Sequence, residues 1–145
     1  MKTDSAMTNI DEPRRPNFSG TWIADLGRSK FLGPSPKALT VLIEQNHDSL
    51  RQELQLTRTD GTEERVIFQF RTNAGESEAM LNGKPTRNNC RWNKDELVIQ
   101  TWVQIRNREL HLRDHWMLSP DGTTLSMEHR DDDLAGQLTI LKRQT

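Results

Sequence analysis

The chain has 145 residues and a formal net charge of −1, with 20 basic and 21 acidic residues mixed along its length. This length fits one domain, and the even mixture of charges excludes the concentrated basic patch that nucleic acids and anionic membranes require. Hydrophobic residues and glycines together make up roughly 38% of the chain, below the roughly 45–50% of typical globular domains, which suits a sheet with one solvated face.

Residues 1–16 are polar, contain Pro13 and Pro16 and show no apolar period. This predicts a disordered N-terminal tail ahead of a single domain over residues 17–145. The tail lacks the apolar centre of a signal peptide, and no stretch of the chain approaches the roughly 18 apolar residues of a membrane span. We therefore expect a cytoplasmic protein without membrane insertion, or a secreted or periplasmic one if a signal peptide has been removed.

From Phe18 onward, polar and apolar residues alternate, and turn signals interrupt the pattern about every ten residues. Asp-Gly and Asn-Gly pairs supply the positive φ angles that tight hairpins need. The alternating runs cover residues 18–25, 38–45, 50–58, 63–71, 76–82, 85–92, 96–104, 109–119, 123–130 and 137–143. Evenly spaced short strands predict sequential hairpins, and an open sheet of this size would leave unpaired edges. We expect an all-β, antiparallel up-and-down β-barrel of about eight to ten strands.

The alternation also predicts which side chains point into the barrel. Val66, Phe68 and Phe70 share one face of their strand, as do Leu39, Val41 and Ile43, and also Leu97, Ile99, Thr101 and Val103. Trp102 lies on the opposite face, which indicates a strand covered on both sides or a surface aromatic residue under a loop. Helix has room only between residues 27 and 37, where two prolines limit it to a turn or two.

The stretch "NFSGTW" resembles the opening strand of the calycin superfamily, which includes the lipocalins and the fatty-acid-binding proteins, with Gly20 and Trp22 in the G-x-W spacing of that group. The segments "WNKDELVIQTW" and "DHWMLSPDGTTLSMEHR" look like hairpins of small bacterial lipocalin-like domains. The resemblance covers nearly all of residues 18–143. It implies that Trp22 closes the barrel base and packs against a basic residue of the last strand, Lys142 or Arg143.

The sequence also departs from the patterns of this superfamily. It contains no tyrosine, so the Arg-x-Tyr carboxylate clamp of the fatty-acid-binding proteins cannot form. The first connection is too short for their two-helix portal, and the T-D-Y motif of the lipocalins is missing. These departures leave the expected barrel intact and leave the ligand unspecified.

The run "ELHLRDHWMLS" places the carboxylate of Asp114 on an apolar face, between Leu112 and Trp116. Charged side chains are rarely buried without a partner. A turn over residues 119–122 would place Asp114 opposite Met127, with His129 diagonal to it and within reach. This pair could bind the polar end of a ligand, act as a general base and its partner, or form a structural hydrogen bond; alternatively, His129 could lie at the solvated end of its strand.

Other polar residues give weaker signals. Gln52 and Arg58 are further candidates for the interior, and Arg113 would replace Asp114 there if the face assignment were inverted. His111 and His115 are four residues apart on one strand, about 13 Å at roughly 3.3 Å per residue, so they cannot share a metal ion. We expect no metal and no cofactor. The single cysteine, Cys90, has no histidine partner and is expected to be buried and inert, while Asp131 to Asp133 are expected to form a solvated loop.

Three functions remain open. The first is binding of a small, mainly apolar or amphipathic molecule inside the barrel, as in lipocalin-like carriers. The second is an isomerase-, cyclase- or hydratase-type enzyme that uses Asp114 and His129 as an acid–base pair, and the third is a filled barrel that binds a protein. The residues expected to contact a ligand are Phe68, Phe70, Ile99, Leu112, Asp114, Trp116, Met127 and His129, and those expected at the barrel base are Gly20, Trp22 and Arg143.

Overall fold

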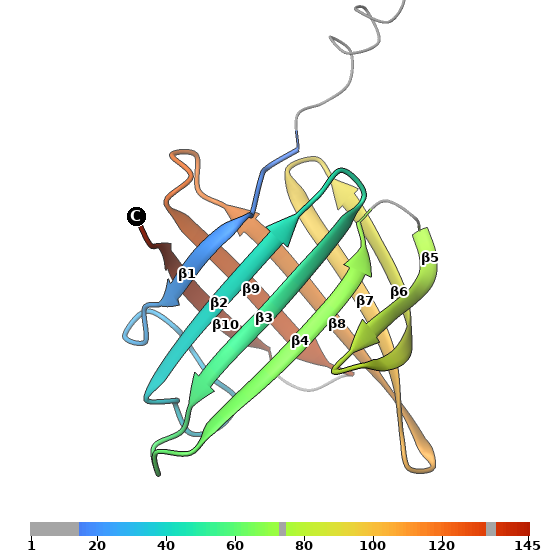
Figure 1. Cartoon of the computed structure of the whole chain (residues 1–145), viewed down its shortest axis with the longest axis horizontal. Helices are drawn as coiled ribbons and strands as arrows, with labels where there is room; N and C mark the ends of the chain where they lie inside the picture. Colours follow the sequence, from blue (N-terminus) through green and yellow to red (C-terminus); the bar gives the residue numbers. More distant parts are fainter. Residues whose placement is uncertain (1–14, 73–74, 133–135) are drawn as a thin grey trace, which may run out of the picture.

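The computed structural model describes residues 15–72, 75–132 and 136–145, which form one closed antiparallel barrel (Figure 1). Each strand pairs with the next in sequence, and β1 also pairs with β10, which closes the barrel. The strands are β1 (Gly20–Ala24), β2 (Ala38–Gln45), β3 (Ser49–Thr57), β4 (Glu63–Arg71), β5 (Gly75–Leu81), β6 (Lys84–Asn93), β7 (Glu96–Ile105), β8 (Arg108–Leu118), β9 (Thr124–Asp131) and β10 (Gln137–Arg143). The predicted all-β up-and-down barrel is confirmed.

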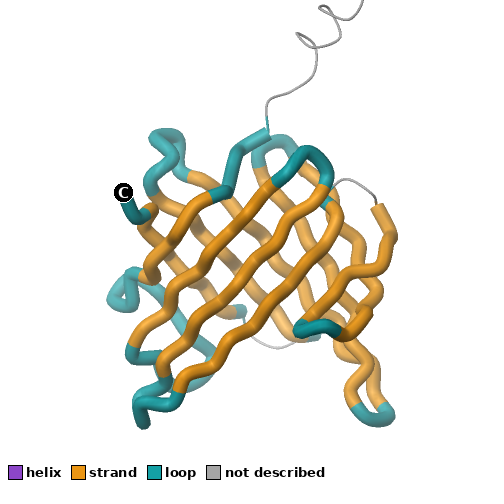
Figure 2. The backbone as a smooth tube through the Cα atoms, viewed as in Figure 1, coloured by secondary structure: helices purple, strands orange, loops and turns teal. Residues whose placement is uncertain are grey.

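No helix occurs within the described ranges, where strands and their connecting loops account for the whole fold (Figure 2). The segment between residues 27 and 37 is a loop that packs beside the last strand, because Lys30 N donates a hydrogen bond to Leu138 O at 2.7 Å. No helix of the described residues is long and apolar enough to cross a membrane.

The strand faces follow the predicted alternation. Leu39, Val41 and Ile43 are buried on β2, and Leu97, Ile99 and Thr101 are buried on β7. An aromatic cluster fills one end of the barrel, where Phe18 stacks on Trp92 at 5.9 Å between ring centroids and meets Trp116 edge-on at 5.6 Å. This end is therefore closed by packed side chains.

Trp22 lies at the same closed end, and its indole is fully buried. Its Nε1 donates a hydrogen bond to Phe18 O at 2.9 Å, and the guanidinium carbon of Arg143 lies 4.3 Å from its ring centroid. Arg143 Nη1 also donates to Ser19 O at 2.7 Å. Of the two basic residues that the resemblance implied, Arg143 is the partner, whereas the side chain of Lys142 is exposed.

Gly20 makes this contact possible. Its φ angle is +142°, and a Cβ atom built there would lie 2.8 Å from Arg143 Nη1. An L side chain would therefore meet both an unfavourable backbone conformation and a steric clash. The glycine of the G-x-W spacing leaves room for the guanidinium that covers the tryptophan.

The chain before β1 also contacts the barrel. The guanidinium of Arg15 lies 5.4 Å from the Trp92 ring centroid, and Gln45 Nε2 donates a hydrogen bond to Pro16 O at 3.0 Å. The disordered tail was predicted for residues 1–16. The rest of it, residues 1–14, lies outside the described residues.

The register between β8 and β9 differs from the sequence-based prediction. Ser119 N donates to Thr124 O at 2.8 Å, so the turn spans residues 120–123 and begins one residue later than expected. Leu118 therefore faces Leu125, and Asp114 faces His129 directly rather than Met127. The predicted register was wrong by two positions, which preserves the inward face because side chains alternate with a period of two.

One seam of the barrel is short. β4 and β5 pair only at Phe68 with Leu81 and at Gln69 with Met80, whereas β7 and β8 pair over nine positions. β5 diverges from β4 beyond this contact (Figure 1). The cylinder is closed, but its hydrogen bonding is thinnest at this seam.

Candidate ligand-binding cavity

A cavity of about 170 Å³ lies inside the barrel, next to Trp116 of the aromatic cluster at the closed end. Its walls are mostly apolar side chains from the inward faces of β3, β4, β5, β7 and β8, with polar groups from β3, β7, β8 and β9. The lining residues are Gln52, Leu54, Val66, Phe68, Leu81, Ile99, Thr101, Leu112, Asp114, Trp116 and His129. A lining of apolar walls with a few polar groups is typical of a ligand site.

The structure brings most of the predicted ligand contacts to this cavity. Phe68, Ile99, Leu112, Asp114, Trp116 and His129 line it, and Phe70 and Met127 do not. The ring of Phe70 packs instead behind the wall, 4.7 Å from Phe68 and 6.1 Å from Trp116 between centroids. Met127 is buried opposite Trp116 in the strand pair. Both belong to the support of the cavity rather than its surface.

The predicted ligand contacts did not include Leu54, Val66, Leu81 and Thr101, which also line the cavity. Of these, Val66 and Thr101 had been placed on the inward faces of their strands. The period-two pattern carried the necessary signal, since each of the four lies on the inward face of its strand. The pattern alone does not say which inward residues border empty space and which are packed.

A second pocket, of about 360 Å³, lies at the end of the barrel opposite Trp22. The loop between β1 and β2 contributes Phe31, Pro34 and Pro36, and the turn between β3 and β4 contributes Thr59 and Asp60. Leu54 and Val66 border both this mouth pocket and the interior cavity. The barrel interior therefore adjoins its open end at these two side chains.

The polar group of the interior is a chain of three side chains on β8 and β9. His129 Nδ1 donates a hydrogen bond to Asp114 Oδ1 at 2.8 Å, and His129 Nε2 donates to Asp131 Oδ1 at 2.5 Å. All three side chains are partly buried, and His129 is 29% exposed. His129 is thus bound by two partners. One of the sequence hypotheses, which placed it at the solvated end of its strand, was wrong.

The hydrogen bond and charge of Asp114, together with the charge and hydrogen bond of Asp131, raise the pKa of His129 to about 9, against the opposing effect of burial. The imidazole therefore carries a proton at neutral pH, with both N–H groups held by carboxylates. Because a protonated histidine cannot accept a proton, this arrangement disfavours His129 as a general base. The three groups together carry a net charge of −1.

Two further polar side chains face the same interior. Gln52 is 8% exposed and lines the cavity. Asn88 is fully buried, and its Nδ2 donates to Thr101 Oγ1 at 3.2 Å, while its Oδ1 has no hydrogen-bond partner among the described residues. Polar side chains therefore reach the interior both from β3, beside β4, and from β6 and β7.

The remaining polar candidates lie elsewhere. Arg58 reaches the mouth pocket and pairs with Glu64 at 2.5 Å, and Arg113 Nη2 donates to Asp132 O at 2.8 Å. Asp131 was expected in a solvated loop but belongs to β9 and binds His129, and Asp132 Oδ1 accepts a hydrogen bond from His111 N; Asp133 lies outside the described residues. The prediction of a loop is therefore corrected for Asp131, whereas Asp132 lies in the turn after β9.

Cys90 is fully buried, and this burial raises the pKa of its thiol to about 12. The thiolate that nucleophilic chemistry requires is therefore strongly disfavoured. Within the described ranges, no group of three or more His, Cys, Asp or Glu side chains is arranged so that it could hold a metal ion.

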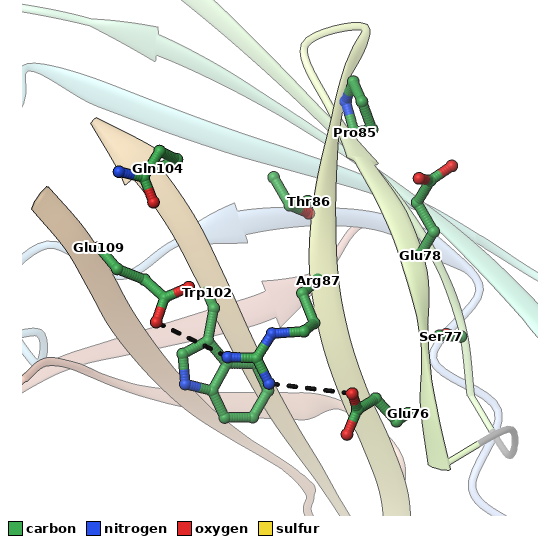
Figure 3. Close-up of a pocket in the computed structure, with 9 residues that line it drawn as sticks. All are labelled: Glu76, Ser77, Glu78, Pro85, Thr86, Arg87, Trp102, Gln104 and Glu109. Atoms are coloured by element: carbon green, nitrogen blue, oxygen red, sulfur yellow. Dashed lines mark ion pairs between the residues drawn. The ribbon is translucent and has the colours of Figure 1, made fainter. Parts of the chain in front are cut away.

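A larger hollow of about 570 Å³ lies on the outer face of β5 to β8 rather than in the barrel (Figure 3). There the Arg87 guanidinium lies 4.1 Å from the Trp102 ring centroid, between Glu76 and Glu109. His111 stacks on Trp102 at 4.7 Å between ring centroids. Trp102 is therefore a surface aromatic residue, as one of the two sequence interpretations held. Its ring is covered by the side chains of Arg87 and His111 rather than by a loop.

No known protein-family model matches this chain, and no curated protein matches it. The closed ten-strand barrel is compatible with a calycin-like fold. Any statement on function depends on the cavity and its residues.

Proposed function

We propose that this protein binds one small, mainly apolar or amphipathic molecule inside its barrel, in the manner of lipocalin-like carriers of the calycin superfamily. The observation that carries the proposal is the interior cavity, whose walls include Phe68, Ile99, Leu112 and Trp116. Burial of apolar ligand surface against such walls drives binding.

The interior cavity alone has the size of a single ring, so a larger ligand requires both pockets. The interior cavity of about 170 Å³ is smaller than the roughly 300 Å³ at which most ligand sites begin, whereas the mouth pocket of about 360 Å³ exceeds it. Because Leu54 and Val66 border both, a ligand with its head inside and its remainder in the mouth would use the two together.

The enzyme hypothesis has weaker support. His129 is held in its protonated form by Asp114 and Asp131, so in such a pair Asp114 would have to serve as the base and His129 as the acid. A binding role asks less of the same residues, since it needs only fixed polar groups at one side of an apolar space.

The proposal is tested by titrating the protein with N-phenyl-1-naphthylamine, a neutral probe whose fluorescence rises in apolar surroundings. We expect saturable binding to the wild type and at least about tenfold weaker binding to Val66→Phe, since the added ring fills the junction of the two pockets. Gln69→Phe is the matched control, because Gln69 lies on the exposed face of the same strand.

Absence of saturable binding, or equal loss in both variants, would instead support a filled barrel whose outer surface carries the function. Native mass spectrometry of protein purified from its host would complement the titration. A compound retained by the wild type and lost from Val66→Phe would identify the natural ligand.

A further inference from the structure

We propose that the cavity selects a single-ring amphipathic molecule that carries a protonated amine, with the ammonium group at Asp114 and the ring against the apolar wall. This inference rests on the proposed function and names its ligand class. It depends on the charge, the hydrogen-bonding groups and the size of the cavity.

The charge of the polar group favours a cation. Two carboxylates surround one imidazolium, so the Asp114, His129 and Asp131 group is negative by one unit. Both N–H groups of His129 already donate to those carboxylates, so the imidazolium offers no donor to an anionic ligand. A ligand carboxylate at this place would meet like charge without a compensating hydrogen bond.

The lining provides no basic side chain to reverse this preference. No Arg or Lys is among the described residues that line the interior cavity. Arg58 lies at the mouth and pairs with Glu64, and Arg143 is held at the closed end by Ser19 O and the Trp22 ring. The absence of tyrosine already excludes the Arg-x-Tyr clamp for a ligand carboxylate. Among the described lining residues, no other basic side chain takes the place of that clamp.

Acceptor atoms remain available to an ammonium group. Asp114 uses Oδ1 for His129, and its Oδ2 has no hydrogen bond within the described ranges. Gln52 is more than nine-tenths buried, lines the same cavity and has no side-chain hydrogen bond to any described residue. Its amide oxygen is therefore an acceptor that a ligand N–H donor can use.

The aromatic walls suit the same ligand. Phe68 and Trp116 line the cavity together with Asp114, and ring faces attract cations when water is excluded. The volume of about 170 Å³ is close to that of an apolar cavity of roughly 150 Å³ that accepts benzene. One aromatic ring therefore fills the interior, with its short polar arm at Asp114.

The test compares three ligands of one shape and different charge: 2-phenylethylamine, 2-phenylethanol and 3-phenylpropionate. Isothermal titration of the wild-type chain at neutral pH is expected to give at least about tenfold tighter binding of the amine than of the alcohol, and the weakest binding for the anion. This comparison needs no variant, so it is independent of any effect of substitution on folding.

Asp114→Asn, which keeps the side-chain shape, is expected to reduce the amine affinity to about that of the alcohol, with the alcohol affinity unchanged within about threefold. Asp48→Asn is the matched control, because Asp48 pairs with Arg71 on the exposed surface away from the cavity. The control is expected to keep the preference for the amine.

Equal or tighter binding of the alcohol or the anion to the wild type would overturn this inference while leaving the proposed function in place. The same holds if the naphthylamine probe binds and none of the three ligands does. If neither the probe nor any of the three binds, the proposed function and the inference fail together.

Discussion

His129 donates hydrogen bonds from both of its ring nitrogens, to Asp114 on the neighbouring strand and to Asp131 on its own strand. A neutral imidazole has one donor and one acceptor, and two carboxylates can only accept. The geometry therefore requires the doubly protonated ring, and the fold stabilises that charge in a partly buried place.

The raised pKa of His129, about 9 against an ordinary value of 6.5, makes stability depend on pH. Because the folded state favours the protonated ring, His129 contributes its full stabilisation to the folded protein below about pH 6.5. This stabilisation is lost as the pH rises through about 9. The free energy of unfolding of the wild type minus that of His129→Gln is expected to fall by on the order of 2 kcal/mol across this window. Urea denaturation at several pH values measures it.

NMR titration of the folded protein provides an independent check of the same group. The His129 ring signals are expected to shift near pH 9, well above those of a free imidazole. A midpoint near 6.5 would show that the two carboxylates do not hold the proton, and the difference in unfolding free energy would then be flat above that pH.

Single residues were predictable where one physical rule was strong. Asp114 on an apolar face needed a partner, since buried charge without one is costly, and its sequence neighbourhood offered His129. Asp131 was not predicted, because a run of three aspartates is usually solvated. β9 extends to Asp131, and the alternation of the strand then places Asp131 on the same face as His129, two residues away. The missing information was where the strand ends.

β5 is held unevenly by its two neighbouring strands. It pairs with β4 at two positions only, whereas its other neighbour, β6, pairs with it at seven. The exposed glutamates on β5, Glu76 and Glu78, are charges of the kind that discourage pairing with another chain. β5 is therefore attached to the barrel mainly through one side.

Hydrogen exchange is expected to reveal this asymmetry. The amides of β5 are expected to show protection at least about tenfold lower than those of β7, which pairs fully on both sides, because local opening needs fewer broken hydrogen bonds. Exchange measured by mass spectrometry on peptides covering each strand tests this. Equal protection in the two strands would mean that β5 opens only with the whole barrel.

The period-two pattern was sufficient to predict the strands and their inward faces, because both depend on local alternation. Register was not predictable to the same degree, since it depends on where a turn begins. Ser119 pairs with Thr124, and this shift of one turn position moved the partner of Asp114 from Met127 to His129. The short β4–β5 seam likewise leaves no mark in the alternation of either strand.

At the level of the whole molecule, Arg143 joins the two ends of the chain. It covers the ring of Trp22, and its guanidinium donates to Ser19 O and Gly122 O. The first strand, the last strand and the β8–β9 turn therefore meet at one cation. Closure of the barrel depends on this meeting as well as on the β1–β10 hydrogen bonds.

Arg143→Gln is expected to lower the free energy of unfolding by about 2 kcal/mol, because it removes charge-assisted hydrogen bonds and the contact with the indole. Lys142→Gln, on the exposed side of the same strand, is expected to change it by less than about 0.5 kcal/mol. Urea denaturation followed by tryptophan fluorescence measures both. Similar effects of the two substitutions would contradict the role given to Arg143.

The C-terminus lies by the end of the barrel that Trp22 and Arg143 close (Figure 1), and the mouth pocket lies at the other end. A fusion partner or surface attachment added at the C-terminus would consequently leave the opening unobstructed. An immobilised form of this protein, held through its C-terminus, should present its entrance to the surrounding solution in one shared orientation.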